Sequence, residues 1–333
     1  MNRGLFSFMA QRSACITSEK EWVVVLEEYR RYWYDLVVNA HDVADYFDTK
    51  KLIVDALKKI KAEVEVAKRF VYFICSRERV RFDTARSPTY NRFTRCAKIH
   101  LLIGRNRKRK AVRLKFESAR HDRCFEPIID VSEKYIIITD EHGERFTSSI
   151  HDFLADIRFP LGLDSRVEYV GITKNPEIRP TDGKHSGLTA TLHRLADECR
   201  DTLIYFNLFK VFSMSGDGSI LFNVSVANAM NDHIDVEIEA DILEKCFIFY
   251  FDAAGQDKNR KHELSELRNN LKQMSEKRNV TRIHVHYEFQ EYSDYGVFSS
   301  TAVQSAARHI FTLLIAENEV KMIDERGKVK NLV

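Results

Sequence analysis

Glycine and proline are scarce in this sequence, at 12 and 5 of 333 residues. This composition excludes a collagenous or low-complexity chain. The sequence also lacks a run of the roughly 18 uncharged residues that a membrane-spanning helix needs. The apolar residues near the start are interrupted by Gln11 and Arg12, which argues against a secretory signal. We therefore expect a cytoplasmic protein with no membrane partner.

Closely spaced cysteines are missing as well. The six cysteines are scattered along the chain and form no Cys-x-x-Cys pair, which disfavours a disulfide scaffold or a zinc ribbon. The sequence also contains no phosphate-binding P-loop, no Rossmann glycine fingerprint and no His-Glu-x-x-His motif. The common nucleotide-dependent and zinc-dependent enzyme classes that these motifs define are therefore not indicated.

The sequence does contain a strong local excess of positive charge. Its length suggests two domains, and its 44% hydrophobic and 30% charged residues are typical of a globular protein. Residues 51–125 hold 22 Lys and Arg against 7 Asp and Glu, a net charge of +15. Because the whole chain has a net charge of +3, the remainder carries −12. Such asymmetry indicates a polyanionic partner.

The densest basic run lies at residues 105–110. Aromatic side chains of Tyr90, Phe93 and Phe116 are interleaved with the surrounding basic residues, as in many nucleic-acid-binding surfaces. The alternative is a solvated turn with no partner. We expect phosphate contacts from the charged members of the run: Arg105, Arg107, Lys108, Arg109 and Lys110.

The first 130 residues are predicted to form a basic α+β module that recognises nucleic acid. Ser18-Glu19-Lys20-Glu21 has the pattern of a capping box and predicts a helix over 18–46. Apolar residues at helical spacing predict a second helix over 49–69. Strands are predicted at 70–75, 97–103 and 111–116, with the basic run in the turn between the last two.

Residues 131–333 are predicted to form a second unit. The expected class is α/β (α+β), with a small mixed or antiparallel sheet flanked by helices. The predicted strands are 134–139, 166–173, 202–213, 219–227 and 281–289, and the predicted helices are 148–156, 239–251 and 302–316, with two more around 188–195 and 264–274.

One segment of the second unit combines a strand, a turn and charged residues in a specific order. Tyr169-Val170-Gly171 lies in a predicted strand, a polar turn follows, and Arg179 comes ten residues after Tyr169. Further on, Glu244 precedes an apolar, aromatic helical run, and Asn259 follows it by fifteen residues. In these features residues 170–260 resemble the GIY-YIG nuclease family.

The resemblance implies a metal-dependent endonuclease that hydrolyses phosphodiester bonds, in DNA rather than RNA, with a role in restriction or defence. Glu244 would bind Mg²⁺ or Mn²⁺, since hard cations prefer carboxylate oxygens. Arg179 would hold phosphate oxygens through its planar fork. Tyr169 or His185 would orient or activate the attacking water, and Asn259 would fix the loop geometry.

The sequence departs from the family pattern at the first tyrosine motif. That motif should end a strand about ten residues before Tyr169, but residues 157–161 contain no tyrosine. The nearest upstream candidate is Tyr135, which requires an insertion between the two strands. In the polar turn, Lys174 is expected to contact nucleic acid.

Two other functions stay open at this stage. The missing first tyrosine favours a non-catalytic nucleic-acid-binding or assembly protein on a decayed nuclease fold. A ribonuclease toxin is the second alternative; Arg179 and His185 have the loose Arg–His spacing of HEPN ribonucleases, although Pro180 and Gly183 place them in a loop rather than a helix. A homo-oligomer is compatible with each of these functions.

Overall fold

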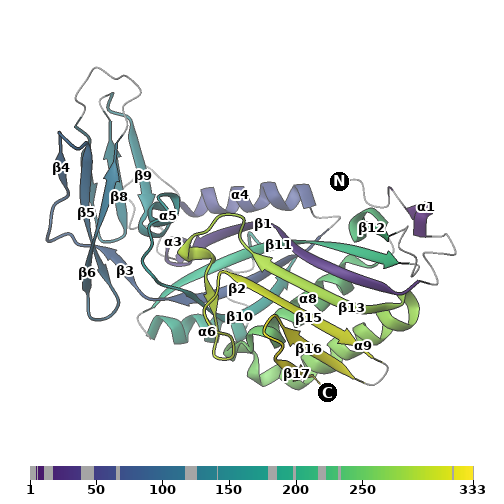
Figure 1. The fold of residues 1–333 in the computed structure, drawn as a ribbon. Coiled ribbons are helices and arrows are strands. Elements are labelled where there is room, and N and C mark those ends of the chain that lie inside the picture. Colours follow the sequence, from purple (N-terminus) through teal and green to yellow (C-terminus); the bar gives the residue numbers. More distant parts are fainter. Residues whose placement is uncertain are drawn as a thin grey trace.

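The protein is an α+β structure made of one large sheet, flanking helices and a projecting lobe of β-hairpins (Figure 1). The computed structural model describes residues 5, 7–10, 18–38, 49–64, 68–116, 126–140, 142–178, 186–197, 200–216, 223–231, 234–316 and 319–332.

The main sheet has ten strands in the order β14-β10-β2-β11-β1-β13-β15-β16-β17, with β12 paired to β11. It is mixed, because β1 runs antiparallel to β11 and parallel to β13. Its strands are β1 (Lys20–Trp33), β2 (Phe70–Arg77), β10 (Ser165–Thr173), β11 (Asp201–Gly216), β12 (Asn223–Ala227), β13 (Val280–Glu288), β14 (Phe298–Ser299), β15 (Arg308–Ile315), β16 (Val320–Asp324) and β17 (Val329–Asn331).

The lobe is inserted between β2 and β10 and lies beyond one end of the main sheet (Figure 1). It contains a four-stranded sheet of β3 (Val80–Phe82), β4 (Thr89–Asn91), β5 (Cys96–Ile103) and β6 (Lys108–Lys115). A three-stranded sheet follows, formed by β7 (Ile128–Val131), β8 (Tyr135–Thr139) and β9 (Arg145–Ser149).

Helices cover the main sheet, and an aromatic core fills the space between. Phe73 of β2 packs against Phe247 of α8 and Tyr287 of β13, with ring centroids 5.2 and 5.3 Å away. No helix among the described residues is long and apolar enough to cross a membrane. The helical segments are α1 (Ser7–Ala10), α3 (Asp35–Val38), α4 (Thr49–Val64), α5 (Ile150–Asp156), α6 (Ser186–Asp197), α7 (Asn228–Asn231), α8 (Val236–Phe251), η2 (Ala254–Asn259), α9 (Arg260–Arg278) and η3 (Asp294–Gly296).

Most predicted elements are confirmed, but two predicted helices are wrong. Residues 20–33 form strand β1, where Trp22 and Val24 are buried at alternate positions and pair with β11. Residues 308–315 form strand β15, whose alternate residues are also buried. In both segments, burial of every second side chain between neighbouring strands outweighs the local helix signals.

The main sheet is larger than expected and crosses the boundary expected near residue 130. Strands β1 and β2 come from the first 130 residues, and they pair with β10, β11 and β13 from the remainder. The hydrogen-bonded sheet is therefore continuous across that boundary. The segment that forms sheets of its own is the lobe between β2 and β10.

A buried polar network joins the lobe to the main sheet. Asp201, the first residue of β11, accepts hydrogen bonds from the Val80 amide at 2.9 Å and from the Arg81 guanidinium at 2.9 Å. The same carboxylate lies 3.0 Å from Nε2 of His151, whose Nδ1 lies 2.9 Å from the Tyr295 hydroxyl. Asp201, His151 and Tyr295 are almost inaccessible to solvent. Burial lowers the pKa of His151, so the neutral ring donates from Nε2 to Asp201 and accepts from Tyr295.

His309 in β15 predicts a pH-dependent stability. Its Nε2 lies 3.1 Å from the Ala306 carbonyl and its Nδ1 lies 3.2 Å from the Tyr250 hydroxyl, and burial lowers its pKa to about 4. Between an unfolded pKa of about 6.5 and this value, the unfolded chain binds more protons, so stability falls as the pH decreases. The expected loss is on the order of 3 kcal/mol between pH 7 and 4. Urea denaturation of wild type and His309→Gln measures it.

The variant should lose less stability than wild type over that range, while His142→Gln, at an exposed position, should behave as wild type. Equal losses in wild type and His309→Gln would contradict the assignment of a buried neutral imidazole.

Candidate functional site

The centre of the candidate site is the pairing of β2 with β10. These strands are antiparallel, and Tyr72 lies directly opposite Gly171. A Cβ at Gly171 would be 2.5 Å from Cζ of Tyr72, so the tyrosine ring lies against the backbone where only glycine leaves room. The ring of Tyr169, two residues earlier on the same face, is stacked with that of Tyr72 at a centroid distance of 6.0 Å. Tyr72 is buried and Tyr169 is partly exposed.

Beyond the short pairing with β14, the outer edge of β10 is bound at Val170 and Ile172 by side chains rather than by a strand. The Gln256 side-chain amide accepts a hydrogen bond from the Val170 amide at 3.2 Å and donates to the Val170 carbonyl at 2.7 Å. The Glu244 carboxyl accepts from the Ile172 amide at 3.0 Å. Both interactions imitate the ladder of a neighbouring strand. The bond from the Ile172 amide holds Glu244 beside the residue that follows Gly171.

Glu244 has an unusual electrostatic environment. Burial raises the pKa of its carboxyl to about 8, with further increases from the charges of Glu263 and Asp241. The charge of Lys245 and the hydrogen bond from Ile172 act in the opposite direction. The carboxyl is therefore mostly protonated at neutral pH unless a cation lies beside it. Perturbed carboxyl groups of this kind are concentrated at functional sites.

Lys245 gathers three carboxylates next to Glu244. Its ammonium group contacts Asp241, lies 3.1 Å from Glu266 and lies 3.4 Å from Glu263. Burial alone would lower the pKa of Lys245, but Asp241, Glu244 and Glu266 raise it, so the side chain stays charged. The buried ammonium neutralises acidic groups that would otherwise repel the ionised form of Glu244.

The structure separates Tyr135 from this site. Tyr135 begins β8 and pairs with Ser149 of β9 in the three-stranded sheet of the lobe. Tyr72, rather than Tyr135, lies on the strand next to Tyr169. The strand of residues 70–75 was visible in the sequence, but the lobe separates its tyrosine from Tyr169 along the chain. The missed signal is the tyrosine of Phe70-Val71-Tyr72-Phe73, in an apolar strand, as a strand mate for Tyr169.

The structure describes two of the four remaining predicted site residues, Asn259 and Lys174. Asn259 is exposed at the junction of η2 and α9, and its side chain makes no capping hydrogen bond. Lys174 lies just beyond β10 and forms an ion pair with Glu237 at 2.5 Å. Arg179 and His185 lie outside the described residues.

The side chains of the basic run differ in their contacts within the lobe. Arg109 lies 3.1 Å from the buried carboxylate of Asp83, and Lys110 donates to the Pro160 carbonyl at 2.7 Å. These two residues have structural partners within the lobe. Arg107 lies 3.6 Å from Glu133 across an exposed pair. Arg105 and Lys108 are exposed at the β5–β6 turn, where they are free to meet an anion.

The donor set around Glu244 is compatible with Mg²⁺ or Mn²⁺ held in part by substrate. Within the described residues, no group of three or more His, Cys, Asp or Glu side chains is arranged to hold a metal ion. Mg²⁺ usually takes one or two carboxylates and completes its shell with water and substrate phosphates. One Glu244 oxygen is bound by the Ile172 amide, and the other would serve as the protein ligand.

Comparisons with known proteins give no relative for this chain. No protein-family model matches it, and neither the curated proteins nor the solved structures contain a significant match.

Proposed function

We propose that the protein is a metal-dependent endonuclease that hydrolyses phosphodiester bonds, in DNA rather than RNA, with a role in restriction or defence. The observation that supports this most strongly is the register of β2 against β10, with Tyr72, Tyr169 and Gly171 on one face and Glu244 held beside Ile172. The GIY-YIG resemblance in the sequence calls for two tyrosines on adjacent strands and a helical glutamate. Tyr72 supplies the tyrosine that the linear motif lacked.

The proposed chemistry uses the side chains in separate roles. Glu244 holds the divalent cation, which when bound supplies charge neutralisation at the phosphate and leaving oxygen. Tyr169, the more exposed tyrosine, and the hydroxyl of Tyr72 position the attacking water or a phosphate oxygen by hydrogen bonding, and the Tyr72 ring supports that of Tyr169. Arg179 clamps the phosphate, as proposed from the sequence, and His185 is the alternative group for orienting water.

The proposal is tested by incubating the full chain with plasmid DNA, linear DNA and RNA. Mg²⁺ or Mn²⁺ should support DNA cleavage and EDTA should abolish it. Cleavage of RNA alone would favour the ribonuclease toxin instead. No cleavage of either substrate under any metal condition would contradict the nuclease proposal.

A non-catalytic nucleic-acid-binding protein is the second candidate, and one observation favours it. The Glu244 carboxyl is a hydrogen-bond partner of the β10 edge and has a pKa of about 8. A protonated glutamate that closes a sheet edge has a structural use without any metal. Nucleic-acid binding without cleavage is the outcome that this candidate predicts.

The Tyr72 hydroxyl provides a prediction specific to the nuclease proposal. Tyr72→Phe keeps the ring stacked on Tyr169 and against Gly171, so the fold should be retained. Loss of one positioned hydrogen-bonding group in a catalytic site is expected to lower cleavage by roughly 100-fold or more. Single-turnover DNA cleavage measures the effect, and Tyr292→Phe, at a position 70% exposed, is the matched control. Equal rates in the two variants would remove Tyr72 from the mechanism.

A further inference from the structure

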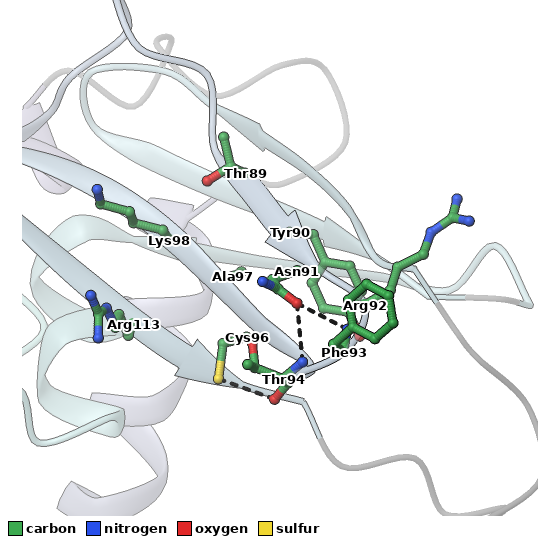
Figure 2. Close-up of a pocket in the computed structure, with 10 residues that line it drawn as sticks. All are labelled: Thr89, Tyr90, Asn91, Arg92, Phe93, Thr94, Cys96, Ala97, Lys98 and Arg113. Atoms are coloured by element: carbon green, nitrogen blue, oxygen red, sulfur yellow. Dashed lines mark hydrogen bonds between the residues drawn. The ribbon is translucent and has the colours of Figure 1, made fainter.

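The four-stranded sheet of the lobe has one exposed face that carries unbalanced positive charge. Lys98 on β5 lies directly opposite Arg113 on β6, and both side chains are exposed. Figure 2 shows the two side chains extending from neighbouring strands on the same face. Like charges at directly opposite positions of an antiparallel pair destabilise the sheet. Within the described part of the chain, neither Lys98 nor Arg113 forms an ion pair that would relieve this repulsion.

The neighbouring positions continue this face. Thr89 of β4 pairs with Lys98, and in the adjacent row Asn91 pairs with Cys96, which pairs with Lys115. The face therefore presents hydroxyl, amide and cationic groups over three strands. The pKa of His100, farther along β5, is lowered. The largest cause is desolvation of the ring, and the next is the charge of nearby cationic side chains, including Lys98. The face has the positive potential that an anionic polymer would neutralise.

An aromatic side chain projects at the end of the same face. Phe93, in the turn between β4 and β5, is 100% exposed. The turn is well defined, because the Asn91 carboxamide oxygen accepts hydrogen bonds from the backbone amides of Phe93 and Thr94 at 2.9 and 3.1 Å (Figure 2). Arg95 follows in a left-handed conformation with φ of 54°. A fully exposed phenyl ring on a fixed turn leaves its apolar surface available to a partner.

We propose that this face, formed by Thr89, Asn91, Phe93, Lys98 and Arg113, binds single-stranded DNA. The cationic pair would contact the phosphates, and Phe93 would stack on an unpaired base. The proposal deepens the proposed nuclease function and rests on it for the choice of DNA over RNA.

The geometry favours a single strand over a duplex. The cationic face is three strands wide, from β4 to β6, whereas the major groove admits an α-helix or a two-stranded ribbon. The bases of an intact duplex are already stacked on each other, so a single exposed phenyl ring has no base face to contact there. Unpaired bases offer such a face in any sequence.

The test is equilibrium binding of the full chain to a labelled single strand, its duplex and the RNA of the same sequence, all in EDTA. The single-stranded DNA should bind most tightly. Phe93→Ala should weaken this binding by roughly 5- to 150-fold, the range for one stacked base, without changing the salt dependence. Lys98→Gln with Arg113→Gln should flatten the slope of log affinity against log salt by about 1.4, since each lost contact with a single strand contributes about 0.7.

Lys261→Gln with Lys277→Gln on α9 is the matched control, because it removes the same charge from exposed positions outside the lobe, and it should change the slope less. Equal slope changes in the two double variants, or wild-type binding by Phe93→Ala, would overturn the proposal. Tighter binding of the duplex would also overturn it, and tighter binding of RNA would exclude DNA as the partner. Because cleavage is excluded by EDTA, retained binding with no nuclease activity in Mg²⁺ would reject only the proposed function.

Discussion

Glu244→Gln is expected to lower DNA cleavage by at least roughly 100-fold while leaving the fold and nucleic-acid binding intact. The glutamine oxygen can still accept the hydrogen bond from the Ile172 amide, which the Glu244 carboxyl accepts at 3.0 Å. The substitution removes the negative charge that the proposed cation requires, and electrostatic groups of this kind contribute about 10²–10³ in turnover. Single-turnover cleavage across a Mg²⁺ titration, with thermal unfolding of the same sample, distinguishes a loss of metal-dependent cleavage from a loss of folding.

The matched control is Glu276→Gln on α9, where the side chain is exposed and pairs only with Lys272 within the described residues. That variant should cleave at the wild-type rate. If Glu244→Gln also cleaves at the wild-type rate in saturating Mg²⁺, then Glu244 closes the edge of β10 and does nothing more. The non-catalytic candidate would then account for the residue.

Asp201→Asn should destabilise the protein by on the order of 3–5 kcal/mol, the range for removing one partner of a buried ion pair. The carboxylate lies within 3.0 Å of both the Arg81 guanidinium and the His151 ring. These partners hold the pKa of Asp201 below its usual range although burial alone would raise it. Without the negative charge of Asp201, the largely buried Arg81 loses its anionic partner. Urea denaturation at pH 7 measures the loss.

Asp130→Asn is the control, since this aspartate is exposed on β7 of the same lobe. It should change stability by less than about 0.5 kcal/mol. Similar denaturation midpoints for Asp201→Asn and Asp130→Asn would mean that the network between the lobe and the main sheet contributes little. A large loss of stability confined to Asp201→Asn would show that this network stabilises the attachment of the lobe to the main sheet.

Sequence patterns predicted the elements that use strong local signals. The helix over 49–69 corresponds to α4, and the apolar run 70–75 corresponds to β2. Strand β1 was mistaken for a helix because its capping-box pattern is local, whereas its pairing partners begin more than 180 residues later in the chain. Local propensity has no access to such distant partners.

The sequence predicted only part of the candidate site, for the same reason. Tyr169 and Glu244 lie within a segment whose spacing could be read directly. Tyr72 acquires its importance only when β2 pairs with β10, and an inserted lobe separates those strands in the sequence. The sequence showed an excess of basic residues but not the face around Lys98 and Arg113, because strand register decides which cationic side chains share a face.

The position of β1 also constrains how the chain completes its fold during synthesis. Lys20 pairs with Val280, so β1 lacks its parallel neighbour until β13 has left the ribosome. At about 5–20 residues per second, that interval is on the order of 10–50 s. During it, β1 would present an open row of backbone groups that can pair with another chain. Pairing of β1 with β13 is thus a late event in synthesis, and until then β1 has an open edge that is exposed to misassembly in newly made protein.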